Sequence, residues 1–286
     1  MKNIKVFVST GYYKNISPIK TLKYLIKKKI NDIEFSGGLP MSLNEEKKFF
    51  KKLKKHNIRL HNYFPPPKEK FVINLASSNR NILKRSIAHV KKSILYSKKI
   101  NAKYFSFHAG FRIDPGIKKL GKKFEKVKME NKNKSENIFL RSVENINRFA
   151  IRNKVKILIE NNVINKKNLS LFNGNPLLLT HPTDILKFFK KAPRNIGFLL
   201  DVGHLKVSSK TENFDLIQSL KRLNKIVLGY HLSENNFFED QNAGFSKNTW
   251  FVKLLKKDLD YYTIEVYDNN IGKIKKIKSF LEKSLN

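Results

Sequence analysis

The feature of this sequence that most constrains its fold is the alternation of short apolar runs with longer amphipathic segments. Eight runs of four to six residues are rich in aliphatic and aromatic side chains and are typical of buried strands. They are Ile4–Ser9, Asp32–Ser36, Ile58–Tyr63, Tyr104–His108, Lys156–Glu160, Gly197–Asp201, Val227–His231 and Tyr262–Glu265. Each predicted strand is followed by a segment with a different periodicity.

The segments between these runs carry apolar residues three and four positions apart, which is the spacing of a helix with one buried face. Ser42 and Glu45 form the capping-box pattern at the start of one segment. The other predicted helices are marked by Leu22, Leu25 and Ile26; by Ile87, Val90, Ile94 and Leu95; by Val143, Ile146 and Phe149; and by Ile185–Phe189, Leu216–Leu223, Trp250–Leu255 and Ile274–Leu285.

Eight strand–helix units in 286 residues correspond to about 36 residues each, which is the size of the unit in a (β/α)8 barrel. The predicted fold class is therefore α/β, with residues 1–286 forming a single-domain TIM barrel. An open, doubly wound sheet would show the same alternation. The sequence contains neither GxGxxG nor GxxxxGKS/T, so no nucleotide-binding fingerprint supports that alternative.

The composition restricts the environment of the protein. The sequence contains no cysteine, which excludes disulfides, thiolate metal sites and cysteine nucleophiles and agrees with a cytoplasmic location. No apolar run approaches the roughly 20 residues of a membrane span, so no membrane partner is expected. The first residues, MKNIKVFVSTGYYKN, are interpreted as leading into a strand rather than as a signal peptide.

The charge of the chain is strongly positive. The 59 lysine and arginine residues exceed the 23 aspartate and glutamate residues, which gives a net charge of +36. Only 9 of the basic residues are arginine, and the lysines are spread along the predicted helices. We interpret the excess as coding bias, with attraction of anionic substrates as its consequence and nucleic acid as the less favoured partner.

Six consecutive predicted strands end in residue types that bind metal ions. Because the strands of such a barrel are parallel, their carboxyl ends form one rim on which distant parts of the sequence converge. Any one of these residues alone is more often an ordinary polar side chain, so the coincidence of the whole set is what favours a metal site. Imidazole and carboxylate groups are common ligands of divalent cations. The set is His61, His108, Glu160, Asp201, His204, His231 and Glu265.

The sequences around these residues resemble those of the xylose-isomerase-like TIM-barrel superfamily, which includes sugar isomerases, sugar epimerases and the endonuclease IV type of DNA repair enzyme. The resemblance spans nearly the whole chain. It is carried by IEN at Glu160, DxxH at Asp201 and His204, HLSEN at His231, and the glutamate at position 265. It implies one divalent metal ion (Mn, Co, Zn or Mg) held by Glu160, Asp201, His231 and Glu265.

The resemblance also implies an activity: isomerisation or epimerisation of a sugar or sugar phosphate by proton transfer through an enediolate. In this reading the metal acts as a Lewis acid, and Glu160 and Glu265 are the two carboxylates that move the proton. His61, His108, His204, Glu34 and Asp240 remain as substrate-binding residues or as ligands of a second metal ion. Arg112 is a candidate for holding a substrate phosphate.

Two alternatives stay open at the level of the sequence. The first is an endonuclease IV-like, zinc-dependent phosphodiesterase that acts on abasic sites in DNA. Its ligand set departs from this chain at Asp240-Gln241-Asn242, where asparagine replaces an imidazole, and Pro65, Pro66 and Pro67 follow the third strand in place of a DNA-contacting loop. The second is a catalytically inactive binding protein. A homodimer is the expected assembly for either enzyme.

Overall fold

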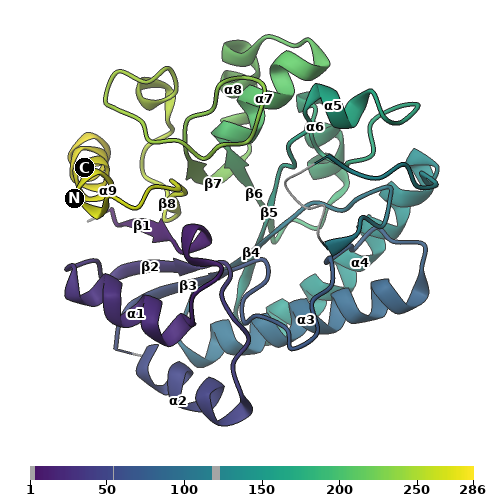
Figure 1. Ribbon diagram of the computed structural model, residues 1–286. Coiled ribbons are helices and arrows are strands. Elements are labelled where there is room, and N and C mark those ends of the chain that lie inside the picture. The colour runs from purple at the N-terminus through teal and green to yellow at the C-terminus, as the bar shows by residue number, and fades with distance from the viewer. Residues whose placement is uncertain (1–3, 54, 118–122) are drawn as a thin grey trace.

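The computed structural model describes residues 4–53, 55–117 and 123–286, and its strands form a closed parallel barrel in sequential order from β1 to β8 (Figure 1). All eight predicted strands are therefore confirmed, and so is the TIM-barrel fold. The strands are β1 (Val6–Ser9), β2 (Asp32–Phe35), β3 (Asn57–His61), β4 (Tyr104–His108), β5 (Lys156–Glu160), β6 (Ile196–Asp201), β7 (Val227–Leu232) and β8 (Tyr262–Ile264).

Helices surround the barrel (Figure 1). The Ser42–Glu45 capping box is confirmed, because the amide of each residue donates to the side chain of the other at 2.9 and 3.2 Å. The helices are α1 (Pro18–Lys27), α2 (Leu43–Leu53), α3 (Arg80–Lys99), α4 (Lys132–Arg152), α5 (Lys166–Leu169), α6 (Pro182–Lys191), α7 (Val202–Glu212), α8 (Leu216–Leu223) and α9 (Ile271–Leu285), with short 3-10 turns η1 (Gly11–Tyr13) and η3 (Val252–Leu254).

Two helical segments differ from the sequence-based expectation. The run Trp250–Leu255 forms only the 3-10 turn η3, because Leu255 is already extended as the chain turns toward β8. Conversely, α7 directly follows β6 and carries no helical periodicity in its sequence, since every residue from Val202 to Ser209 is buried. A helix enclosed on all sides has no polar face to produce an amphipathic pattern.

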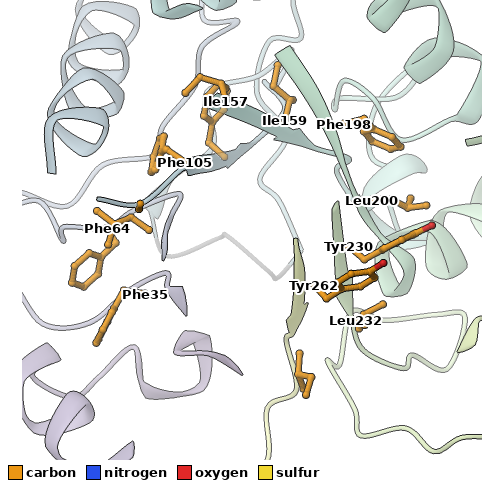
Figure 2. Close-up of a cluster of buried hydrophobic side chains, with 14 of the residues drawn as sticks. Phe35, Phe64, Phe105, Ile157, Ile159, Phe198, Leu200, Tyr230, Leu232 and Tyr262 are labelled. Atoms are coloured by element: carbon orange, nitrogen blue, oxygen red, sulfur yellow. The ribbon is translucent and has the colours of Figure 1, made fainter. Parts of the chain in front are cut away.

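The core divides according to the alternation of side chains along each strand. One set of strand residues points outward and packs against the helices, and Figure 2 shows Phe35, Phe105, Ile157 and Phe198 among them. The other set fills the interior of the barrel. There, Tyr104, Leu158, Leu199 and Tyr261 form a separate buried cluster. This apolar layer closes the barrel below the polar residues at the carboxyl ends of the strands.

The segment that leads into β1 lies beside the end of α9 (Figure 1). Asn286 accepts a hydrogen bond from the amide of Ile4 at 2.8 Å, and Glu282 accepts one from the amide of Val6 at 3.2 Å. The last helix is therefore tied to the start of β1, and the direct pairing of β1 with β8 closes the ring. Within the described ranges, no helix has both the length and the apolar character needed to cross a membrane.

The packing of α2 gives a prediction about stability. Phe49 is fully buried, with its ring centroid 5.2 Å from that of Phe35 and 5.8 Å from that of Phe64. Truncation to alanine should lower the free energy of unfolding by about 3–5 kcal/mol, measured by urea denaturation. Leu43 lies on the same helix with 63% of its surface exposed, so Leu43→Ala is the matched control. Equal losses in the two variants would contradict the assigned packing of α2.

Candidate metal centre

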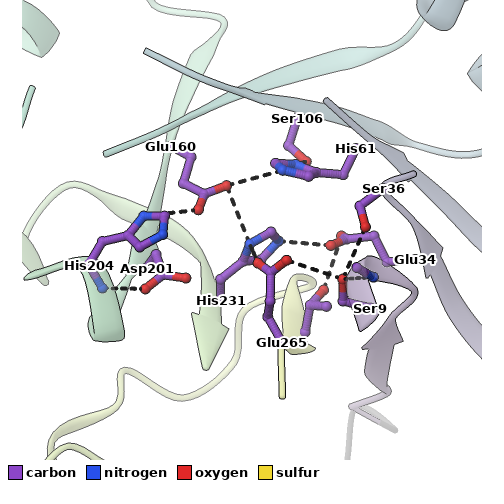
Figure 3. A network of polar contacts seen from close by, with 12 residues as sticks. Ser9, Glu34, Ser36, His61, Ser106, Glu160, Asp201, His204, His231 and Glu265 are labelled. Carbon is purple, nitrogen blue, oxygen red and sulfur yellow. Dashed lines mark hydrogen bonds and ion pairs between the residues drawn. The ribbon is translucent and has the colours of Figure 1, made fainter. Parts of the chain in front are cut away.

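Glu160, Asp201, His231 and Glu265 converge at the carboxyl-terminal rim of the barrel (Figure 3). One ligand atom from each lies within 4.8 Å of the ligand atoms of the others. Glu160, Asp201 and His231 have no solvent-exposed surface, and Glu265 retains 7%. The four residues predicted as ligands of one ion are thus brought together, although the first and last are more than one hundred residues apart in the sequence.

Strand register explains this convergence. Asp201 pairs with His231 across β6 and β7, and His108 pairs with Glu160 across β4 and β5. Parallel neighbours in register place their last residues at the same height, with the same orientation toward the barrel axis. Asp201 is also the N-cap of α7, since its Oδ1 accepts from the amide of His204 at 2.6 Å. This cap fixes the carboxylate and places His204 beside it.

Three further histidines surround Glu160. Nε2 of His61 lies 3.4 Å from Glu160 Oε2, whereas Nδ1 of His108 and Nδ1 of His204 lie 3.7 and 3.4 Å from Oε1. His61, His108 and Glu160 form a second group whose ligand atoms meet within 4.8 Å. The side chain of His108 is 28% exposed, so this part of the site is the one that faces solvent.

Asp240 lies on the far side of His204, with Oδ2 3.4 Å from the Nε2 of that imidazole. Its Oδ1 accepts a hydrogen bond from the side-chain Nδ2 of Asn235 at 3.0 Å. Asn242 is buried with a left-handed backbone (φ 49°), and its side-chain oxygen accepts no hydrogen bond in the described structure. The Asp240–His204 contact is therefore present, but an amide stands at the position where a third zinc site would need an imidazole.

Glu34 occupies a different place from the other acidic residues, because it lies on β2 beneath His231 and has no exposed surface. Its Oε1 is 2.8 Å from Nε2 of His231. Its Oε2 accepts hydrogen bonds from Thr263 Oγ1 at 3.0 Å and from the Tyr261 hydroxyl. Both carboxylate oxygens of Glu34 thus face protein groups rather than the open end of the barrel.

The polar atoms of the centre fit a divalent cation. Both oxygens of Glu160, Oδ2 of Asp201 and Nδ1 of His231 are buried and form no hydrogen bond within the described residues. Buried polar atoms without partners are costly, and a cation among them would satisfy all four. The mixed carboxylate and imidazole donors suit Mn, Co, Zn or Mg.

The surroundings of the centre shift the pKa values of Asp201 and Glu160 in opposite directions. Burial raises the pKa of Asp201 to about 7, because the lowering effect of His204 is opposed by the nearby carboxylates of Glu160, Asp240 and Glu265. Burial also disfavours ionisation of Glu160, but His108 and His231 beside it outweigh that effect and lower its pKa well below the ordinary range. Burial lowers the pKa of His108 to about 4, which favours a neutral imidazole with a free ligand position.

Some residues of the centre were not predicted from the sequence. Ser106 contacts His61 Nδ1 at 2.9 Å, and Thr263 contacts Glu34. Each stands two positions before a predicted site residue in its strand, so the period-two alternation of strands would have found both. Tyr267 has no such signal. Its hydroxyl lies 3.4 Å from Glu265 Oε1, and its ring occupies the space that a side chain at Gly11 would need.

Arg112 does not serve the predicted role of a phosphate ligand in this arrangement. Its three guanidinium nitrogens donate to the backbone carbonyls of Glu130 and Asn175 at 2.7–3.1 Å. It therefore ties together the two long segments that follow β4 and β5.

Comparison with known proteins identifies the family. The family model described as xylose isomerase-like TIM barrel matches residues 30–282, and the chain belongs to this family. No curated protein matches the sequence.

Several solved structures share the fold at low sequence identity. A D-tagatose 3-epimerase-like protein has a TM-score of 0.70 at 17% identity, covering 98% of each chain. D-psicose 3-epimerase from Clostridium cellulolyticum H10, solved with D-tagatose, has a TM-score of 0.63 at 12% identity, covering 99% of this chain and 96% of that one. The IOLI protein with a bound zinc atom has a TM-score of 0.65 at 14% identity, covering 99% of both.

The raised pKa of Asp201 makes a prediction about the metal-free protein. An aspartate in the unfolded chain has a pKa of about 3.9, so above that pH the unfolded state loses its proton more readily and stability decreases up to about pH 7. Asp201→Asn removes this cost and keeps a capping side chain. It should raise the free energy of unfolding by about 0.5–2 kcal/mol at pH 8 and leave it unchanged near pH 4, measured with a chelator present.

Asp215 provides the control for this experiment, because it caps α8 in the same way but is exposed. Asp215→Asn should show no comparable pH-dependent gain. A loss of stability in Asp201→Asn at pH 8 would contradict the electrostatic account of the centre.

Proposed function

We propose that this protein is a divalent-metal-dependent isomerase or epimerase that acts on a sugar or sugar phosphate. The observation that carries the proposal is the convergence of Glu160, Asp201, His231 and Glu265 around one point at the open end of the barrel. Structural neighbours that act on sugars, among them D-psicose 3-epimerase, support the substrate class. A cytoplasmic location and a homodimer are part of the same proposal.

In this proposal the four residues hold one divalent ion, which supplies Lewis-acid polarisation of a sugar carbonyl and its neighbouring hydroxyl. Glu160 and Glu265 are the carboxylates that remove and return the proton on the carbon beside that carbonyl. The lowered pKa of Glu160 keeps it ionised near neutral pH, as a proton acceptor must be. Removal of the proton leaves the enediolate of the sugar, and return of the proton from the other side inverts the carbon.

The remaining polar residues are assigned to the substrate. His108 and Asp240 each have 28% of their side chains exposed and flank the buried ligands, so the sugar approaches along this side. His204 lies between Glu160 and Asp240 and can contact a sugar hydroxyl. The group His61, His108 and Glu160 offers ligands for a second ion, and the number of metal ions bound is therefore part of the test.

Metal content is the first test. Purified protein should contain near one equivalent of Mn, Co or Zn by elemental analysis, and His231→Ala should lose it because an imidazole ligand is removed. His56→Ala, which changes a residue just before β3 and outside the site, should retain it. Two to three equivalents of zinc would instead favour the alternative function, a phosphodiesterase that acts on abasic sites in DNA. No metal in the wild-type protein, even after reconstitution, would contradict both enzymatic readings.

Proton transfer is the second test. The wild-type protein incubated with D-tagatose or D-fructose in deuterated water should incorporate deuterium beside the carbonyl, followed by nuclear magnetic resonance. Glu160→Gln and Glu265→Gln should each slow incorporation by about 10²–10⁴-fold.

Glu239→Gln is the control, since Glu239 is exposed and paired with Lys167 at 2.9 Å. Comparable exchange in all four proteins would contradict the two-carboxylate mechanism. Exchange with sugar phosphates alone would narrow the substrate class.

A further inference from the structure

A chain of hydrogen bonds that ends in an ion-pair contact lies beneath the metal centre and joins two histidines of the site. It runs from His61 Nδ1 to Ser106 Oγ at 2.9 Å, and from Ser106 Oγ to the Tyr261 hydroxyl at 2.8 Å. Tyr261 in turn donates to Glu34. Glu34 faces Nε2 of His231 at 2.8 Å (Figure 3). All five residues have 2% exposure or less, so water does not compete for these contacts.

The directions of the hydrogen bonds in this network follow from donor and acceptor counts. An ionised carboxylate only accepts, so the single proton of Tyr261 points to Glu34. The Tyr261 oxygen is then the acceptor for Ser106, which uses the only proton of the serine hydroxyl. Ser106 can therefore only accept from His61, and the proton of that imidazole lies on Nδ1.

On the other side of Glu34, the contacts with His231 indicate where the proton of that imidazole lies. Nε2 of His231 is at ion-pair distance from Glu34 Oε1, although outside hydrogen-bond alignment, and only a protonated nitrogen is attracted to a carboxylate. Thr263 Oγ1 donates to Oε2 at 3.0 Å, which holds the carboxylate in place. Nδ1 of His231 lies 2.8 Å from Glu265 Oε2 and 3.3 Å from Glu160 Oε2. A cation bound among these three atoms takes the lone pair of Nδ1, and the proton of the ring then lies on Nε2, facing Glu34.

We propose that Glu34 is a positioning residue of the metal centre, and that the Glu34–Tyr261–Ser106 network sets opposite tautomers in His231 and His61 when a cation is bound. Nδ1 of His231 is then the free nitrogen toward Glu160 and Glu265, and Nε2 of His61 is the free nitrogen toward Glu160. The inference rests on the proposed function for the identity of His231 as a metal ligand. It also narrows the role of His61: its Nε2 can bind a cation or accept a proton from a sugar hydroxyl, but cannot donate one.

Carboxylates that hold the second nitrogen of a metal-bound histidine fix its orientation and raise its basicity, and their loss costs about 10–100-fold in metal affinity. Glu34 has the position for this role, since its carboxylate lies on the side of the His231 ring opposite to Glu160. Arg59 supports the network from below, with its guanidinium carbon 4.2 Å from the centre of the Tyr261 ring and 3.6 Å from that of Phe7.

The test compares Glu34→Gln and Tyr261→Phe with wild type. The protein is labelled with ¹⁵N-histidine, and the tautomers are read from ¹⁵N–¹H correlation spectra of the imidazole rings; zinc affinity is measured by competition with a chelating dye. Tyr104→Phe is the matched control, because Tyr104 lies in the same buried layer and its hydroxyl bonds to Asp260 at 3.0 Å, outside the network.

In the wild-type protein with zinc, we expect the proton on Nε2 of His231 and on Nδ1 of His61. In Tyr261→Phe, the His61 ring should populate both tautomers. Glu34→Gln should lower zinc affinity about 10–100-fold. Tyr104→Phe should change neither. If Glu34→Gln fails to fold, the His61 signals of Tyr261→Phe decide the question.

Three results would overturn the inference: a proton on Nε2 of His61, wild-type tautomers and affinity in both network variants, or equal effects in Tyr104→Phe. Absence of zinc binding in wild type would refute the proposed function instead. In that case the His61 tautomer still decides, since its proton lies on Nδ1 whether or not an ion is present.

Discussion

Charge compensation inside the barrel is the interaction on which the rest of the site depends. Glu34, Glu160 and Asp201 are carboxylates without solvent exposure, and His231 lies within 3.3 Å of two of them. Such a group of charges is unfavourable in a medium of low polarity unless each is paired. The lowered pKa of Glu34, about 2, and the raised pKa of Asp201 are two outcomes of one balance. Burial opposes both charges, but the His231 imidazole outweighs burial at Glu34, whereas neighbouring carboxylates oppose the effect of His204 at Asp201.

The barrel makes this balance feasible by separating dry and polar layers. The cluster of Tyr104, Leu158, Leu199 and Tyr261 closes the interior below the site and excludes water from one side. Tyr261 belongs to both layers, since its ring packs in the apolar cluster and its hydroxyl reaches Glu34. The centre is therefore open only at the carboxyl ends of the strands, where His108 and Asp240 remain partly exposed and where a sugar would enter.

The local sequence accounts for most of the fold, because each strand and most helices carry their own periodicity. The exceptions have physical causes. The buried helix α7 lacks a polar face, and the apolar run Trp250–Leu255 has the composition of a helix but only one 3-10 turn. Leu95 was expected on the buried face of α3, yet it is 49% exposed, because Val90 and Ile94 already fill the contact with the barrel.

The amino-acid sequence alone was sufficient to predict the barrel, its eight strands and the group of strand-end residues around Glu160. Period-two and helical patterns are properties of short segments of sequence. A parallel barrel then places the carboxyl ends of all its strands at one rim. Which of these residues contact one another, and which side of the site each occupies, could be established only from the three-dimensional structure. Glu34 and Asp240 are both acidic candidates for the site, but the pleat of β2 directs Glu34 toward His231, whereas Asp240 comes from the loop after β7 and lies beside His204. Hydrogen-bond partners, burial and proton positions depend on contacts between distant segments, and no local pattern encodes them.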